Sequence, residues 1–242
     1  MTRHPRWILV AVAAMLLTAQ AARAQVTYQW ETLPPAAGSH EIFNNSQGTE
    51  TEDCWVANAF QVVAAGTRLN SISLFVGSAL TNQSVTVTIY NGTSLTVPSG
   101  LSRIVASTNT VSVTSAAETL TNIPLASPVN LSVGQIFYAA VLIRAVPGTL
   151  FPFASDAGET PPVTPLGHSF FDVGPTQGAA YNLDVTTNAT VLGGTHPVVD
   201  GAQSPGNLGL RVLATPVPEP SSLALAGFGL AVVARRWRRS KL

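Results

Sequence analysis

The sequence predicts an all-β fold, a single domain of the β-sandwich or jelly-roll type. Three observations predict it. About ten short strand-like segments follow one another, separated by turn-forming Gly, Pro, Asn and Ser residues. Residues 84–90, S-V-T-V-T-I-Y, alternate strictly and place Val85, Val87 and Ile89 on one face. Between its two ends, the chain has no amphipathic helical stretch of useful length and no repeat of fixed period.

The expected strands follow in order. They are 26–31, 55–63, 69–76, 84–90, 103–107, 111–114, 118–123, 136–144, 151–154, 169–173, 181–185 and 208–213. We expect the pair 91–92, Asn-Gly, to end the fourth strand as a turn, because this pair accepts positive φ. Residues 136–144 are almost continuously apolar, which is typical of a central strand buried on both faces. Residues 39–53, 148–167 and 186–207 are polar or rich in Gly and Pro, and indicate loops.

Charge and cysteine content exclude two classes of protein. The segment 25–214 holds four arginines, no lysine and eleven acidic residues, a net charge of −7. This charge excludes nucleic-acid binding through a basic surface. The chain has one cysteine, Cys54, so an intrachain disulfide is excluded and the core must hold the fold. We expect Cys54, beside Trp55, to be a small buried hydrophobe.

Residues 1–24 have the pattern of a secretory signal peptide. Arg3 and Arg6 precede an apolar stretch at 8–19, and the small-residue site Ala22-Arg23-Ala24 follows. We expect cleavage after Ala24, so that the mature chain begins at Gln25; an uncleaved helix is the alternative. The body, 25–214, then has about 190 residues, which suits one domain.

Residues 215–242 have the pattern of a membrane anchor. Pro218, Glu219 and Pro220 precede an uncharged apolar run at 223–234, and four arginines follow it: Arg235, Arg236, Arg238 and Arg239. This is a stop-transfer pattern, which predicts a transmembrane helix whose positive end stays cytoplasmic, with the body on the other side. At ~1.5 Å per residue it covers only about 18 Å of a hydrocarbon core of about 30 Å. The alternative, a buried helix of the core, conflicts with the arginines.

These three elements, in this order, resemble the PEP-CTERM sorting signal. The resemblance implies an exosortase as partner, a membrane-embedded cysteine peptidase that cuts near Pro218-Glu219-Pro220 and passes the protein toward the surface. It implies a precursor in the inner membrane, a mature protein at the cell surface or outside the cell, and a link to exopolysaccharide or biofilm. Residues 57–90 and 128–143 are similar to a β-sandwich module common in PEP-CTERM proteins, which supports the fold but no chemistry.

We expect no catalytic site, metal or cofactor. His40, His168 and His196 lack zinc-ligand spacing, and there is no nucleophile elbow, phosphate loop or dinucleotide motif. Acidic groups at 50–53 and 156–159 leave open a calcium site or a glycosidase pair, although solvated loops are the simpler interpretation. A dyad of Cys54 with a distant histidine has no flanking signature.

The expected function is therefore that of a non-enzymatic exported protein. One alternative is a carbohydrate-binding module, because exposed aromatic rings stack on sugars; a secreted hydrolase is the less favoured one. The aromatic candidates, most of which we expect in the core, are Trp30, Trp55, Tyr90, Phe151, Phe153, Phe170, Phe171 and Tyr181.

Overall fold

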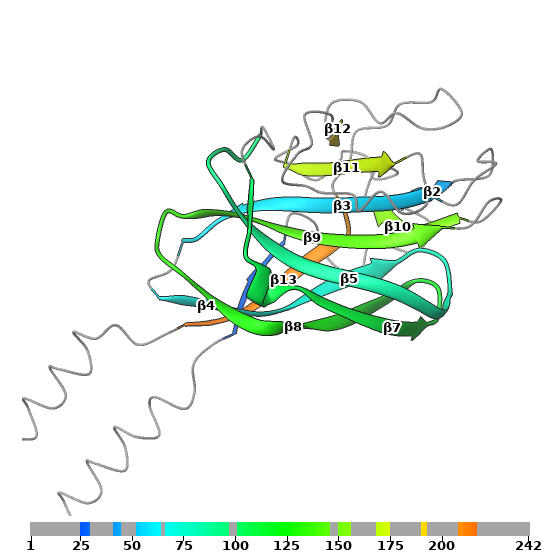
Figure 1. The fold of residues 1–242 in the computed structure, drawn as a ribbon, viewed down its shortest axis with the longest axis horizontal. Helices are drawn as coiled ribbons and strands as arrows, with labels where there is room; N and C mark the ends of the chain where they lie inside the picture. The colour runs from blue at the N-terminus through cyan, green and yellow to red at the C-terminus, as the bar shows by residue number, and fades with distance from the viewer. Residues whose placement is uncertain are drawn as a thin grey trace, which may run out of the picture.

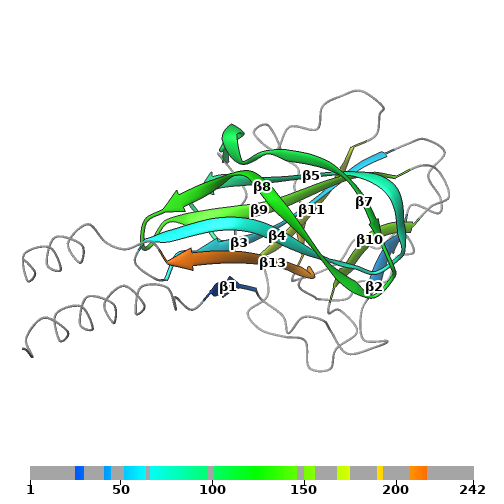
Figure 2. The same ribbon diagram turned by 90° about the horizontal axis from the view of Figure 1, so that it is seen from below.

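The computed structural model describes residues 25–29, 41–44, 52–63, 66–96, 101–145, 150–155, 168–174, 190–192 and 208–216. Within these ranges, side chains are not described for 41–44, 52–54, 144–145, 150–152, 154–155, 171–174 and 190–192. The described part is an all-β fold of two sheets packed face to face (Figures 1 and 2). Its single short helical element is a 3₁₀ turn, η1 (Val105–Ser107).

All strand pairs in both sheets are antiparallel. The first sheet consists of β1 (Val26–Tyr28), β13 (Leu210–Pro216), β4 (Thr67–Val76), β10 (Leu150–Ser155) and β2 (Glu41–Asn44), with β8 (Thr119–Leu131) paired to β4. The second consists of β12 (Thr190–Leu192), β11 (Ser169–Gly174), β3 (Glu52–Gln61), β9 (Ile136–Ala145), β5 (Leu80–Gly92) and β6 (Ser102–Arg103), with β7 (Asn109–Ser115) paired to β5.

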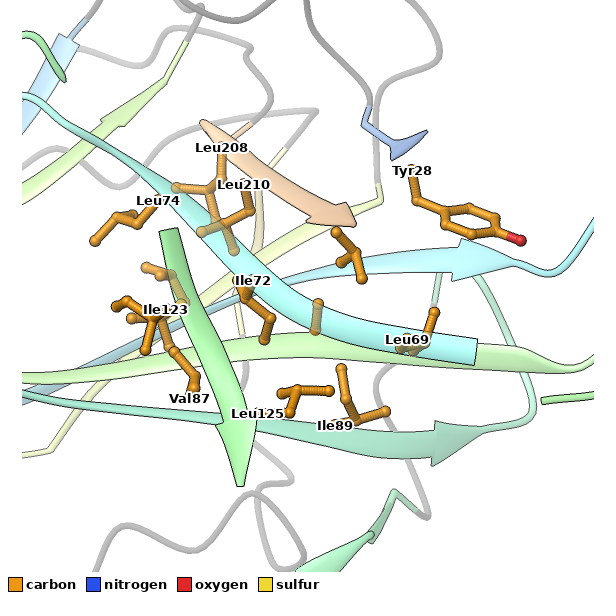
Figure 3. Close-up of a cluster of buried hydrophobic side chains, with 14 of the residues drawn as sticks. Tyr28, Leu69, Ile72, Leu74, Val87, Ile89, Ile123, Leu125, Leu208 and Leu210 are labelled. Carbon is orange, nitrogen blue, oxygen red and sulfur yellow. The ribbon is translucent and has the colours of Figure 1, made fainter. Parts of the chain in front are cut away.

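The main core lies between the two sheets. It is filled by the inward-facing side chains, which are every second residue along each strand. Val85, Val87 and Ile89 of β5 face inward, as the period-2 pattern predicts, and are fully buried. They meet side chains of β4, β8 and β13 from the opposite sheet (Figure 3). The labelled residues of this core are Tyr28, Leu69, Ile72, Leu74, Val87, Ile89, Ile123, Leu125, Leu208 and Leu210.

β9 is the central strand of the second sheet and is buried on both faces, as its apolar run predicts. Phe137, Val141 and Ile143 point into the main core, whereas Tyr138 and Ala140 belong to a second apolar cluster on the outer face. The other buried members of this outer cluster are Trp55, Ala57, Ala59, Tyr90, Leu101 and Phe170. Both faces of this sheet are therefore apolar at its centre.

Several local expectations were wrong. Residues 103–107 are not a strand, because β6 ends at Arg103 and η1 follows. β2 lies at Glu41–Asn44 and β12 at Thr190–Leu192, within segments expected to be loops. Both strands are short, and their backbone pairs with strands that are distant in the sequence, β2 with β10 and β12 with β11. The expected strand 181–185 lies outside the described residues.

The turn expected at 91–92 was also wrong, because both residues belong to β5. Asn91 and Gly92 pair with Phe137 and Ile136 of β9, so the ladder continues to the end of the strand. Gly92 is needed there for space: a Cβ atom on it would lie 2.8 Å from Cδ2 of Tyr138. The Tyr138 ring thus covers the backbone of the neighbouring strand.

Candidate functional site

β13 is the last described strand and leads toward the C-terminal tail. It pairs with β4 from Leu210↔Leu74 to Pro216↔Thr67. On its other side it pairs with β1, with Val26 opposite Ala214. Because β1 and β13 are antiparallel, Val26 and Pro216 lie at the same end of the sandwich (Figures 1 and 2). We call this the tail-proximal end.

Buried contacts hold the tail-proximal end together. The Tyr28 ring on β1 packs edge-on against Phe137, with ring centroids 5.3 Å apart, and lies 6.0 Å from Phe60. The hydroxyl groups of Tyr28 and Thr67 are 3.2 Å apart and share a buried hydrogen bond. Since Thr67 also pairs with Pro216, the first strand, the first residue of β4 and the last residue of β13 form one connected unit. The folded body therefore continues to Pro216.

Beyond Pro216, comparison with known families gives one match. Residues 216–239 match the PEP-CTERM protein-sorting motif. The chain carries a PEP-CTERM sorting motif. Neither a curated protein nor a solved structure matches the chain. The PEP-CTERM motif indicates a protein of the envelope or the extracellular space that an exosortase sorts, and it implies membrane anchoring with the exosortase as processing partner.

The matched segment starts at the last residue of the last strand. β13 ends at Pro216, and the motif residues Pro218, Glu219 and Pro220 follow after Val217 alone. The sorting motif therefore has almost no spacer from the folded domain. A fully extended chain spans at most about 3.3–3.6 Å per residue, so the whole motif lies within roughly 15 Å of Pro216.

All residues predicted for sorting lie outside the described residues. These are Ala22 and Ala24 at the expected signal cleavage site, Pro218, Glu219 and Pro220, and the cluster Arg235, Arg236, Arg238 and Arg239. Among the residues that the structure describes, no helix has the length and hydropathy needed to span a bilayer.

The aromatic residues form no exposed platform in the described part. Trp55, Tyr90, Phe153 and Phe170, four of the candidates for sugar stacking, are at most 3% exposed. Side chains of Phe151 and Phe171 are not described, and Trp30 and Tyr181 lie outside the described residues. The expectation that most of these rings belong to the core is confirmed for the four that the structure places. They pack in the two apolar clusters, and no described ring offers a face to a sugar.

Tyr138 belongs to the outer cluster and carries a hydroxyl group. Its ring lies 5.4 Å from that of Phe170, and its hydroxyl donates a 2.5 Å hydrogen bond to the carbonyl oxygen of Ser94. This bond fastens the segment that follows β5 to the outer face. Burial raises the pKa of the Tyr138 hydroxyl well above its usual range, so the group remains a neutral donor.

The described residues show no constellation for metal binding. Within the part of the chain that has placed side chains, no three His, Cys, Asp or Glu residues come together. His168 precedes β11 and is half-buried, and desolvation lowers its pKa, which favours the neutral imidazole. Cys54 lies opposite Ile143 and Asp53 opposite Arg144 in the β3–β9 ladder. His40, His196 and the acidic residues at 50 and 156–159 lie outside the described residues.

Sequence reasoning missed a buried polar network between the two sheets. Asn58 on β3 and Ser169 on β11 are both fully buried. The Asn58 amide donates to the carbonyl oxygen of Leu208 at 3.0 Å, and the Leu208 amide donates to Oγ of Ser169 at 3.0 Å. One signal points to it: Asn58 lies between Val56 and Phe60, at an inward position of its strand. The network has no access to solvent and is structural.

Proposed function

We propose that the chain is the precursor of a non-enzymatic surface protein, held in the inner membrane by its tail until an exosortase cuts near Pro218-Glu219-Pro220. The observation that carries this proposal is the PEP-CTERM motif at 216–239, which follows directly on the last strand. The prolines support it, since each removes a backbone donor and disfavours helix in the preceding residue. We therefore expect a motif of this composition to be accessible to a peptidase.

The residues after the motif provide the membrane segment. The run 223–234 is uncharged, and the four arginines after it fix the orientation, because positive ends remain cytoplasmic. Snorkelling of the arginine side chains and the uncharged residues 220–222 lengthen the span. In this arrangement the β-sandwich faces the periplasm, and the exosortase meets its substrate at the outer surface of the inner membrane.

The described side chains support a role other than catalysis. The apolar clusters are closed and the inter-sheet polar network is buried. With these groups used for packing, the outer surface of the sandwich remains as the functional part.

One surface feature favours association with exopolysaccharide. Because Val85, Val87 and Val113 point inward, the alternate residues of β5 and β7 point outward and form a hydroxyl strip: Ser84, Thr86, Thr110, Ser112 and Thr114. Ser84 lies opposite Ser112 and Thr86 opposite Thr110, whose hydroxyl oxygens are 2.8 Å apart. Hydroxyl groups both donate and accept, which suits the hydroxyls of a neutral polysaccharide.

Polysaccharide binding is tested with the full-length protein and exopolysaccharide purified from the host. The double variant Thr86→Val/Thr110→Val should lose retention in a pull-down, whereas Thr93→Val, which changes an exposed threonine after the end of β5 and outside the strip, should keep it. Equal retention of all three proteins would remove the strip from the proposal.

Sorting is tested by the intact mass and the location of the protein in its host, with and without the exosortase. A product that begins at Gln25, ends near Pro220 and leaves the membrane only when the enzyme is present supports the proposal. Protein that keeps its full-length tail in the inner membrane of both strains would show that the C-terminal segment is a simple anchor and is not cut. The body would then act in the periplasm.

A further inference from the structure

We propose that the tail-proximal end of the sandwich contacts the outer surface of the membrane that holds the tail, through two exposed valines, Val63 and Val133. The inference rests on the proposed anchoring of the precursor. It adds an interaction surface on the folded body, with a phospholipid surface as the partner.

The first observation is the placement of exposed apolar side chains. Among the described residues, the large hydrophobic side chains that are exposed are Val63 at 76%, Val105 at 69% and Val133 at 58%. Two of the three lie together at the tail-proximal end. The Val62 amide donates to Gln135 at 2.9 Å and the Gly134 amide donates to Val62 at 2.8 Å. These bonds extend the β3–β9 ladder and bring Val63 beside the turn that carries Val133.

The second observation is that the turn is rigid. The Gln135 amide donates to the Ser132 carbonyl at 3.1 Å and Gly134 has a φ of +81°, which is the geometry of a type II turn with Val133 at its first central position. The side chain of Gln61 donates to the Gly134 carbonyl, and that of Gln135 both accepts from the Ser132 amide and donates to Asn91. A turn fixed by so many bonds holds an apolar tip in water without collapsing, and it loses little entropy on binding.

The third observation is the distribution of charge along the sandwich. Five acidic residues belong to the described part, and by strand register all five lie in the half away from the tail: Glu41, Glu52, Asp53, Glu118 and Asp172. Two of the arginines, Arg68 and Arg103, lie in the tail-proximal half, opposite Thr215 and Tyr90. A body with a net charge of −7 thus presents an end without described acids to an anionic membrane surface, which avoids repulsion.

The fourth observation is the length of the tether. Only residues 217–222 separate Pro216 from the apolar run that begins at Leu223. At ~3.3–3.6 Å per residue, this segment spans at most about 25 Å when extended. The tail-proximal end is therefore held close to the bilayer, where its effective concentration at the surface is high. An apolar tip of this kind inserts among headgroups, as interfacial side chains do.

Photocrosslinking of the full-length protein tests the contact. Benzoylphenylalanine replaces Val63, Val133 or, as a control, Val105, which is similarly exposed but belongs to η1, beside Thr88 and Ile89 of β5 and outside the turn at 132–135. The protein is reconstituted in vesicles of phosphatidylethanolamine and phosphatidylglycerol, irradiated and analysed for lipid adducts by mass spectrometry. We expect severalfold more lipid adduct at 63 and 133 than at 105. A flexible Gly/Ser insertion between Pro216 and Pro218 should reduce the adducts at 63 and 133.

The outcomes separate the two proposals. Equal adduct at all three positions, in protein that resists carbonate extraction, would overturn the contact and leave the anchoring intact. Release of the protein by carbonate would overturn the anchoring itself. Adducts with a co-reconstituted exosortase in place of lipid would reassign the surface to the peptidase and overturn the lipid contact.

Discussion

Oγ of Ser169 donates a 2.7 Å hydrogen bond to Oδ1 of Asn58, and neither residue has any exposed surface. The two side chains lie on adjacent strands of one sheet and are both bonded to the backbone of Leu208, which leads into β13 of the other sheet. Buried polar groups bonded in this way fix how two apolar faces align, because a shifted alignment leaves each of them unsatisfied.

The first prediction concerns this network. Asn58→Ala removes the amide that donates to the Leu208 carbonyl and accepts from the Ser169 hydroxyl, and leaves that hydroxyl proton without its acceptor, so the free energy of unfolding should fall by about 1–3 kcal/mol. Urea denaturation followed by intrinsic fluorescence measures it. The control Asn130→Ala changes an exposed residue and should stay within about 0.5 kcal/mol of wild type. A loss of similar size in both variants would contradict the structural role of Asn58.

The second prediction separates two reasons for glycine. Gly92→Ala brings a Cβ against the Tyr138 ring and should cost about 1–3 kcal/mol. Gly134→Ala meets no atom within 4 Å but keeps a positive φ, which costs about 1–2 kcal/mol. Asparagine tolerates this φ, so Gly134→Asn should recover most of the loss, whereas Gly92→Asn should recover none. Thermal unfolding of the four variants tests the distinction.

The third prediction concerns Tyr138. Tyr138→Phe removes the hydrogen bond to the Ser94 carbonyl and should lower the free energy of unfolding by about 0.5–1.5 kcal/mol at pH 7. Because burial raises the pKa of Tyr138 in the folded state, the unfolded state loses this proton first. The wild type should therefore lose stability relative to the Phe variant as the pH rises above about 10. Parallel stability curves for the two proteins from pH 8 to 11 would contradict the raised pKa.

The fourth prediction concerns His168. Desolvation lowers its pKa in the folded state, so the unfolded state binds the proton more readily. The contribution of neutral His168 to the free energy of unfolding should be fully present above about pH 6.5, the pKa of an unperturbed histidine. It should decline as the pH falls below this value. His168→Gln should flatten this part of the curve, and the difference between the two proteins isolates the histidine from the carboxylates. An unchanged slope between pH 7 and 5 would show that His168 does not contribute.

The fifth prediction concerns membrane topology. Replacing Arg235, Arg236, Arg238 and Arg239 by glutamine removes the charges that keep the end of the tail cytoplasmic, so the tail should slip across the membrane. Protease protection of a C-terminal epitope in spheroplasts reports this directly. Wild-type protection in the quadruple variant would mean that the apolar run alone determines the orientation.

The fold was predictable where the hydropathy pattern of a single strand reports which of its faces are buried. The alternation at 84–90 and the apolar run at 136–144 each report local burial, and the structure confirms an inward face for the first and a central position for the second. The errors arose where contact with a residue distant in the sequence determines the local structure. Nothing near Gly92 indicates that the Tyr138 ring, from a neighbouring strand, lies on its backbone and keeps it within the sheet.

The same distinction holds for the functional elements. The sorting motif is a linear signal that a partner enzyme reads from consecutive residues, so Pro218, Glu219 and Pro220 could be identified without a fold. The Asn58 network depends on Ser169 and Leu208, more than 100 residues away in the chain, and only its inward position gave a hint. The valines at the tail-proximal end could not be grouped before the β3–β9 ladder was known.

The pairing of β13 has a mechanical consequence. A pull on the tail is applied along the axis of this strand, which lies between β1 and β4 with hydrogen bonds to both. Ladder bonds run perpendicular to the strands, so the load stretches both rows in shear and they must break together, not one after another as in a peeling hairpin. A cell-surface protein attached at this position would transmit force through the strongest direction of its own sheet.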